Sequence, residues 1–204
     1  SNDLPEKTQA TLSFGVIGGG GGIQKLSKNK KASWGLSYNY TNLALAFAVI
    51  KQKQDYFNIP VFHEADANFR IKTKTGGMIK YYGYLSLGKV GFRINDIDSI
   101  SLKDAFRLKN NNTYHNINWR ENLGKGWKLQ AGLSYSNNKD NISNELQDAN
   151  DKTILISNPA GYEFKNYAIV TKADYAQARF VLEKRLKGLN MVRFGSDYFY
   201  SHEK

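Results

Sequence analysis

The chain has no cysteine, few prolines and no long hydrophobic run. Because its 204 residues include no cysteine, neither disulfides nor a thiolate metal site can hold the fold together. Three prolines mark no linker, so we expect residues 1–204 to form one segment without an internal domain boundary. The longest uncharged stretch, residues 32–50, is interrupted by serine, threonine and asparagine, which argues against a membrane-spanning helix.

Residue types that usually carry chemistry are also sparse. The three histidines, His63, His115 and His202, lie far apart and lack the spacing of a metal site. No nucleophile and general base can be recognised as a pair. We therefore expect no enzymatic activity, no cofactor and no bound metal.

Positive charge is in excess but is not concentrated. The chain has 29 lysines and arginines against 18 acidic residues, a net charge of +11. These cations are scattered through predicted turns, loops and polar strand faces, without an aromatic RNA-binding motif, so we expect no nucleic-acid partner. On a membrane barrel they would suit lumen electrostatics, anionic solutes or lipopolysaccharide phosphates, and an ordinary solvated surface is the alternative.

Aromatic residues are abundant and follow a strand pattern. They make up 13% of the chain, with 13 tyrosines. In the stretch SWGLSYNY, the large residues Trp34, Leu36, Tyr38 and Tyr40 alternate with small or polar ones, which places them on one face of a β-strand. The same alternation recurs around residues 67–72, 128–135 and 191–200. The sequence therefore predicts an all-β protein with one apolar and one polar sheet face.

Marking strands by this alternation predicts an antiparallel up-and-down meander of about eight strands. The expected ranges are 8–26, 32–50, 64–74, 78–93, 111–122, 126–138, 164–185 and 190–202. Four connections are short turns, SKNKK, KTGG, NLGKG and LKGLN, and they alternate with long links at 51–63, 94–110 and 139–163. In a meander this order places the short turns at one edge and the long loops at the other. That arrangement is typical of an outer-membrane β-barrel, although soluble meanders also alternate.

Two segments leave a choice open. The stretch ADYAQARFVLEKRLKG, residues 173–188, has apolar residues at both helical and strand spacing, and its neighbours favour a strand. A short helix around Ser99 to Lys109 is compatible with the second long link.

Five consecutive glycines, Gly18 to Gly22, precede the first clear alternation. They lack the Gly-Lys-Ser/Thr ending and the following helix of a phosphate-binding loop. We expect a strand that has lost its side chains where another part of the molecule comes close, and a flexible loop tip is the alternative.

Local phrases resemble a known family. The order TLSFGVIGGGGGIQKL, SWGLSYNYTNLALAFAVIKQKQDYFNIP and ANFRIKTKTGGMIKYYGYLS, continuing through NNTYHNINWRENLGKGWKLQAGLSYSNNKDNI to NMVRFGSDYFYSHEK, is similar to the barrel of TonB-dependent outer-membrane receptors of the Bacteroidetes type. The resemblance implies a run of consecutive strands from a larger transmembrane barrel. Nothing in the chain resembles the plug domain or the energy-coupling box of such receptors.

The same resemblance implies a function and partners. A complete receptor would lie in the bacterial outer membrane and import a scarce nutrient, such as an iron chelate or a glycan, by energy-coupled gated transport. Its partners would be outer-membrane lipid and lipopolysaccharide, the plug domain and remaining strands of the same receptor, and the TonB complex through parts missing here. A self-contained eight-stranded outer-membrane barrel with a structural or adhesive role, and a soluble β-barrel that binds a small ligand, remain as alternatives.

Two groups of residues are candidates for contacts. Aromatic residues in the first long link, together with its histidine, could bind the solute by stacking. These residues are Tyr56, Phe57, Phe62 and His63. Polar residues of the predicted strands should face the lumen and the plug. These are Asn68, Arg70, Lys72, Asn118 and Arg120.

Overall fold

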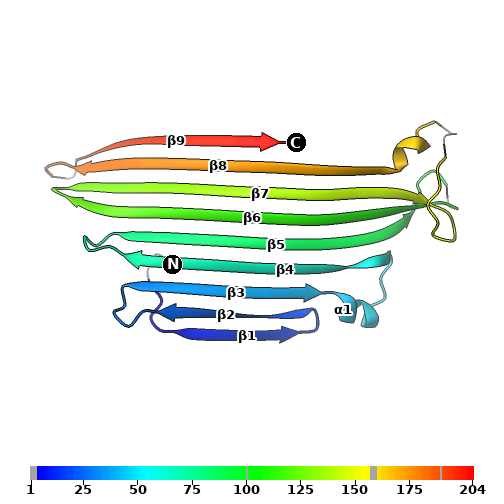
Figure 1. Ribbon diagram of the computed structural model, residues 1–204, viewed down its shortest axis with the longest axis horizontal. Helices are drawn as coiled ribbons and strands as arrows, with labels where there is room; N and C mark the ends of the chain where they lie inside the picture. The colour runs from blue at the N-terminus through cyan, green and yellow to red at the C-terminus, as the bar shows by residue number, and fades with distance from the viewer. Residues whose placement is uncertain (1–3, 100, 157–159, 189) are drawn as a thin grey trace.

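The computed structural model describes residues 4–99, 101–156, 160–188 and 190–204. Within them the chain forms one antiparallel sheet in which each strand pairs with the next along the sequence (Figure 1). The strands are β1 (Gln9–Gly15), β2 (Gly18–Leu26), β3 (Ala32–Asn42), β4 (Asp55–Lys72), β5 (Met78–Asn95), β6 (Lys103–Gly124), β7 (Trp127–Gln147), β8 (Tyr167–Arg185) and β9 (Met191–Glu203). A helix, α1 (Ala44–Val49), and a 3₁₀ turn, η1 (Tyr162–Lys165), complete the described elements.

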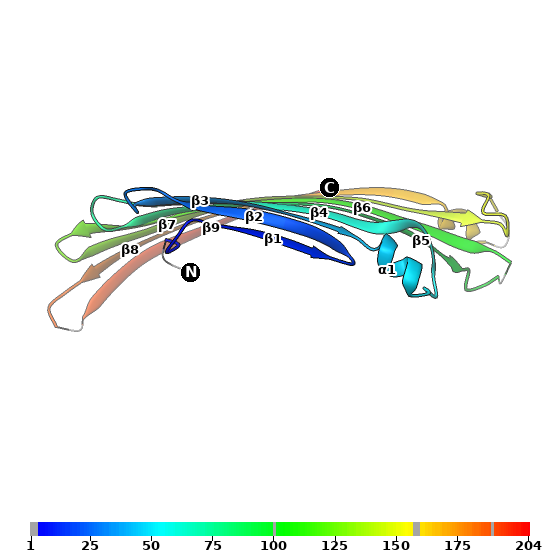
Figure 2. The same ribbon diagram turned by 90° about the horizontal axis from the view of Figure 1, so that it is seen from below.

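The prediction of an all-β up-and-down meander is confirmed, with nine strands in an open sheet. In Figure 2 the sheet is seen almost edge-on as a single twisted layer, with α1 on one side of it. The strand order runs from β1 to β9 without closing, so each of these two strands has a partner on one side. Segment 173–188, where the sequence left a choice, belongs mainly to β8.

The predicted first strand, 8–26, is wrong because it is a hairpin. β1 and β2 reverse at Val16 and Ile17, with Gly15 paired to Gly18. Gly18 has φ of 149°, and a Cβ at this position would overlap the backbone of Tyr40. Only glycine fits this bend without strain, so the glycine run begins where the chain turns.

The glycine run itself lies inside β2, between β1 and β3. Side chains of the neighbouring strands lie over these glycines, in the space that β2 side chains would otherwise occupy. A Cβ on Gly19 would meet the Phe14 ring at 3.1 Å, and one on Gly21 would meet Leu12 Cδ1 at 3.1 Å. The expectation of a strand without side chains at a close approach is therefore confirmed, and the parts that approach are the adjacent strands.

The predicted strand 32–50 ends early. β3 stops at Asn42, whose side-chain oxygen accepts a hydrogen bond of 2.9 Å from the Ala44 backbone N–H as α1 begins. Alanine and leucine have high helix propensity, and five of the six residues of α1 are alanine, leucine or valine. The helix suggested for Ser99 to Lys109 is wrong, because β6 already begins at Lys103.

Two of the three predicted long links, 94–110 and 139–163, are shorter than expected, and the first, 51–63, is displaced to 43–54. We call the end of the sheet with residues 27–31, 73–77, 125–126 and 186–190 the turn edge, and the other end the loop edge. The loop edge has connections 16–17, 43–54, 96–102 and 148–166, because β4 to β7 run further toward it than the alternation indicated. Figure 1 shows these long strands projecting past β1, β2 and β3. No helix in the described part of the chain is long and apolar enough to cross a bilayer.

Candidate functional site

The half of the sheet near the turn edge has one apolar face. Strand pairing places one apolar or aromatic residue from each of the strands β3 to β9 in a single row across the sheet. This row is Trp34, Phe69, Tyr81, Ile117, Leu133, Ala178 and Tyr198. We call this side the belt face, and the apolar zone around the row the belt. Leu36 and Phe194 belong to the same face, so the predicted sharing of one face by these large residues is confirmed.

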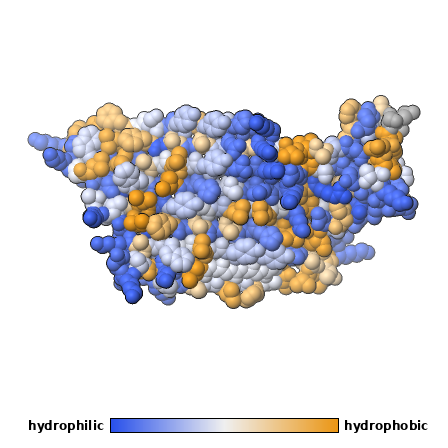
Figure 3. Space-filling view, viewed as in Figure 1, coloured by the Kyte–Doolittle hydropathy of each residue, from blue (hydrophilic) through white to orange (hydrophobic). Residues whose placement is uncertain are grey.

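The belt has a limited height along the strands. On β5 it runs from Ile79 to Leu87, which is about 27 Å at about 3.4 Å per residue. Large residues of the belt are strongly exposed: Leu36 and Leu133 are each 54% exposed and Phe194 is 58% exposed. On the side of the sheet drawn in Figure 3, orange and pale residues interleave across the middle, and blue residues crowd both ends of the strands.

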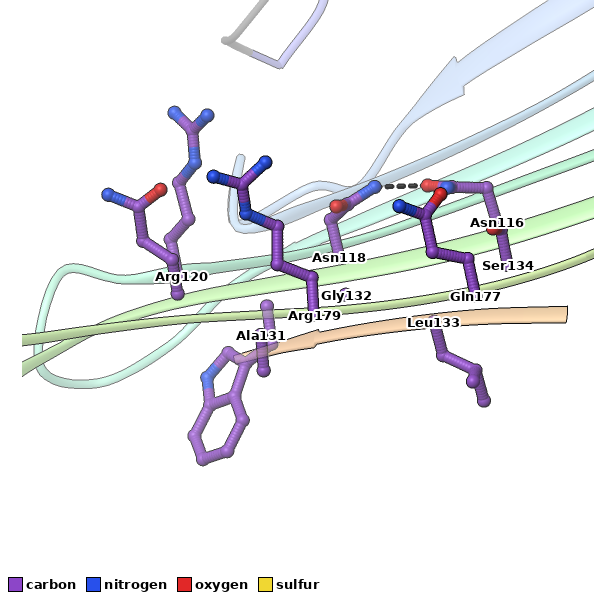
Figure 4. Close-up of a pocket in the computed structure, with 11 residues that line it drawn as sticks. Asn116, Asn118, Arg120, Ala131, Gly132, Leu133, Ser134, Gln177 and Arg179 are labelled. Atoms are coloured by element: carbon purple, nitrogen blue, oxygen red, sulfur yellow. Dashed lines mark hydrogen bonds between the residues drawn. The ribbon is translucent and has the colours of Figure 1, made fainter. Parts of the chain in front are cut away.

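The opposite side of the same strands, the polar face, carries cations and amides. The predicted lumen residues Asn68, Arg70, Lys72, Asn118 and Arg120 all lie on it. Arg70 and Asn118 occupy one row, Lys72 and Arg120 the next. Figure 4 shows Arg120, Arg179 and Asn118 projecting to one side of the sheet while Leu133 projects to the other. The sharing of one face by the five predicted residues is therefore confirmed, and a contact with a plug remains a prediction.

A polar hollow of about 380 Å³ lies among these residues. Its floor is Gly132, which pairs with Asn118 on one side and Arg179 on the other. A Cβ on Gly132 would meet the Asn118 side-chain oxygen at 3.0 Å, so the missing side chain deepens the hollow. Arg179 also forms a loose ion pair of 3.6 Å with the exposed Asp197.

Carboxylates occupy the polar face one to three rows beyond the row of Asn68, toward the loop edge. Glu64 accepts a hydrogen bond of 2.7 Å from the Tyr84 hydroxyl. Asp66 accepts one from the Ser37 hydroxyl, and Asp140 accepts one from the Asn110 amide. Each carboxylate therefore has a neutral donor from an adjacent strand. The charge of the polar face changes from positive near the turn edge to hydrogen-bonded negative groups nearer its middle.

Beyond the belt the two faces exchange character. On the polar side, ring contacts link Phe47 of α1 to Tyr56, Tyr56 to Phe92, and Phe92 to Phe106, with centroid distances of 4.8, 5.9 and 5.3 Å. On the belt side, the same strands carry Arg93 and Arg107, whose guanidinium carbons lie 4.5 and 4.9 Å from the centroid of the Phe57 ring. Alternation therefore continues along each strand, but the apolar residues move to the other face.

The four predicted binding residues do not form one cluster, and they do not lie in a loop. All belong to β4, with Tyr56 and Phe62 on the polar side and Phe57 and His63 on the belt side. His63 shares a hydrogen bond of 2.7 Å with the Tyr38 hydroxyl, and its ring lies 5.0 Å from that of Tyr40. Their role in solute binding remains a prediction, now for two separate surfaces.

An ion-pair network surrounds Phe57. Arg93 pairs with Asp55 at 3.0 Å, Lys103 pairs with Asp151 at 2.8 Å, and Arg107 pairs with Glu145. The Arg107 hydrogen bond, opposed by partial burial, lowers the pKa of Glu145 below its ordinary value of 4.5. Sequence analysis missed this network because five of its six residues fall in predicted links. The alternation of Arg93, Arg107 and Glu145 with apolar neighbours could have revealed it.

A second network fastens the long 148–166 connection to the 96–102 connection. The Asp96 carboxylate is fully buried and forms an ion pair with Lys165, while Tyr162 donates a hydrogen bond of 3.2 Å to it. Burial opposes ionisation of Asp96, but hydrogen bonds from Lys165, the Asp98 backbone and Tyr162 together hold its pKa below the ordinary value of 3.8. The Asp96 hydrogen bond raises the pKa of Lys165 above 10.5. Beside this pair Leu146 is fully buried, and its backbone N–H donates to Asn166 at 3.0 Å.

Comparisons with protein families, curated proteins and solved structures gave no match. Among the residues that the structure describes, no group of three or more histidine, aspartate and glutamate side chains is placed to hold a metal ion. The three histidines lie apart on β4, β6 and β9. The functional argument therefore depends on the distribution of polarity over the two faces.

Proposed function

We propose that this chain is part of the wall of an outer-membrane β-barrel. The observation that carries the proposal is the belt: large apolar residues cover one side of a single-layer sheet over the height of a bilayer, while the other side is polar. A sheet in water has to bury its apolar face against a second layer. The outward apolar band of a membrane barrel is about 25 Å tall and is solvated by lipid, which suits the belt.

The open edges support a wall that continues beyond this chain. β1 and β9 have one neighbour each, and unpaired backbone groups are costly in a hydrocarbon environment. Further strands of the same barrel would satisfy both edges. The polar face would then line the lumen, where its cations and amides offer hydrogen bonds to a plug.

The wall belongs, in this proposal, to a TonB-dependent receptor that imports a scarce nutrient such as an iron chelate or a glycan. The loop edge would face the exterior, and its ring series from Phe47 to Phe106 offers stacking surfaces at the entrance of the lumen. Transport would proceed by gated passage without bond chemistry, driven by energy delivered through other parts of the receptor. The support for this finer assignment is the family resemblance together with the shape and polarity of the wall.

The absence of native cysteine makes a direct test simple. Nitroxide labels on Leu133→Cys and Ser134→Cys report on two adjacent residues that face opposite sides of β7. After reconstitution into lipid, we expect the Leu133 label to collide more with oxygen and the Ser134 label more with a water-soluble nickel complex. Equal exposure of both labels to the nickel complex would reject the membrane wall.

A further inference from the structure

Five lysines form a band directly beyond the belt, on the belt face. They occupy two adjacent rows toward the loop edge, of which the nearer also contains Leu87. We call them the lysine band: Lys89, Lys109, Lys139, Lys172 and Lys204. Four are exposed and Lys139 is half-buried.

Strand pairing places these like charges opposite each other. Lys89 is the direct partner of Lys109, and Lys139 is the direct partner of Lys172. Lys172 and Lys204 exchange two backbone hydrogen bonds of 2.9 Å, so a third lysine continues the row nearer the belt. Directly opposite residues have Cβ atoms about 5 Å apart, and like charges in this position destabilise a sheet. Two such pairs in neighbouring rows call for a compensating anion.

The protein supplies little negative charge at this place. Among the described residues, none of the five ε-amino groups forms an ion pair with a carboxylate. Asp174 lies one row nearer the belt on the same face, but its carboxylate already accepts hydrogen bonds of 2.5 Å from Tyr135 and 2.8 Å from Asn137. His63 lies in the same row as Lys139 and adds no negative charge.

The cations next along the same face are arranged differently. Arg93, Lys103 and Arg107 each have a carboxylate within ion-pair distance. The cations farthest from the belt therefore have ion-pair partners, whereas in the described part of the chain no carboxylate lies within ion-pair distance of the lysines beside the belt. This contrast indicates that the partner of the lysine band comes from outside the chain, at the height where the belt ends.

We propose that the lysine band binds the phosphate groups of anionic lipids whose acyl chains lie against the belt. This inference rests on the proposed function, because it places the belt in a bilayer. Phosphate groups of such a lipid then meet the sheet just beyond the apolar zone, in the leaflet on the side of the loops. Lysine is suited to this role because its long stem extends along the belt while its ammonium reaches the headgroup.

The test uses the whole chain in dodecyl maltoside micelles, which contain no phosphorus and no charge. Phosphatidic acid is titrated into the micelles and its binding is followed by phosphorus NMR, with inorganic phosphate titrated in a separate arm. The band variant carries Lys89→Gln, Lys109→Gln, Lys139→Gln and Lys172→Gln. The matched control, Lys28→Gln, Lys31→Gln, Lys74→Gln and Lys187→Gln, removes the same charge at the turn edge.

We expect the unmodified chain to bind phosphatidic acid at least about tenfold more tightly than inorganic phosphate. Each lysine pair removed from the band should weaken lipid binding about tenfold, and the control should weaken it less than about twofold. Equal losses in the two variants, or equally tight binding of inorganic phosphate, would overturn the inference.

Two further measurements keep the result interpretable. Infrared amide spectra of the band variant and of the control verify that the sheet is retained. Micelle binding by the unmodified chain reports on the belt alone: its absence contradicts the proposed membrane wall. Micelle binding without a preference for phosphatidic acid at the band contradicts only the lipid inference.

Discussion

The half of each strand near the turn edge, the turn half, and the half near the loop edge, the loop half, have opposite distributions of polar and apolar residues over the two faces. In the turn half, Leu133 and its row are apolar on the belt side while Arg179 and Asn118 occupy the other side. In the loop half, the belt side carries Arg93 and Arg107, and the aromatic rings have moved across the sheet. One backbone geometry therefore carries two polarity patterns in series. A strand that leaves a bilayer and continues into water needs this change, because its outward residues meet lipid first and solvent later.

The two halves are also stabilised differently. The loop half contains the fully buried Asp96 side chain and the fully buried residues Leu146 and Ala105. The turn half has few buried residues, and its large apolar groups remain exposed. We infer that the loop half is held by internal ion pairs and hydrogen bonds, whereas the turn half depends on the surrounding solvent.

The largest expected effect is a local loss of stability in the loop half that leaves the turn half unchanged. Lys165→Met leaves the buried Asp96 carboxylate without its cation, which should destabilise the docked 148–166 connection by about 3 kcal/mol. Hydrogen exchange should become faster at Leu146 and in the 96–102 connection, with exchange in β3 and the turn half of β7 unchanged. Lys152→Met, an exposed lysine in the same connection, is the control. Unchanged protection at Leu146 would show that the ion pair does not hold the two connections together.

A charged residue introduced into the belt should destabilise the turn half in lipid. Leu133→Arg should lower the free energy of unfolding by about 2–4 kcal/mol in a bilayer, because the guanidinium would face hydrocarbon. The matched Ser134→Arg change on the polar face should have an effect below about 0.5 kcal/mol. Denaturant titration in lipid vesicles measures both variants, and equal losses would contradict the assignment of faces.

The smallest effect is a dependence on pH confined to the loop edge. The lowered pKa of Asp96 means that its contribution to stability is present above its ordinary pKa of 3.8 and is lost as pH falls through the lower folded value. The raised pKa of Lys165 places loss of its contribution on the alkaline side, above 10.5. Proteolysis within residues 148–156 should therefore accelerate below about pH 4 while the belt strands remain protected. Simultaneous loss of both halves would argue for a single cooperative unit.

The sequence predicted the turn half well because alternation there has a constant phase. Trp34, Phe69 and Leu133 are all large, and each has small or polar neighbours. The loop half was assigned to links because Phe106, Leu108 and Ile142 lie out of phase with the apolar residues that follow or precede them. Their strands are rich in asparagine, aspartate and lysine, which are also common in loops. The change of phase becomes visible only when neighbouring strands are aligned.

The candidate site was less predictable than the fold. Arg70 and Asn118, predicted to face a lumen, could be placed on one face from period 2 alone. The ion pair between Asp96 and Lys165 joins residues far apart in sequence, and the opposition of Lys89 to Lys109 depends on the register between two strands. Single-sequence patterns do not specify such pairings. Tyr56 and Phe57 were recognised as notable residues, but their separation to opposite faces follows from the β4 conformation.

The glycine run of β2 has a consequence for alignment. If β2 slid by two residues along β3, each residue would keep its face, and glycine would replace glycine through most of residues 18–22. The run therefore does not determine its own register. The alignment has to be fixed at one end, where Ile23 lies opposite Leu36 and Lys25 lies opposite Trp34. The first hairpin is thus the part of the sheet whose pairing can most readily adjust.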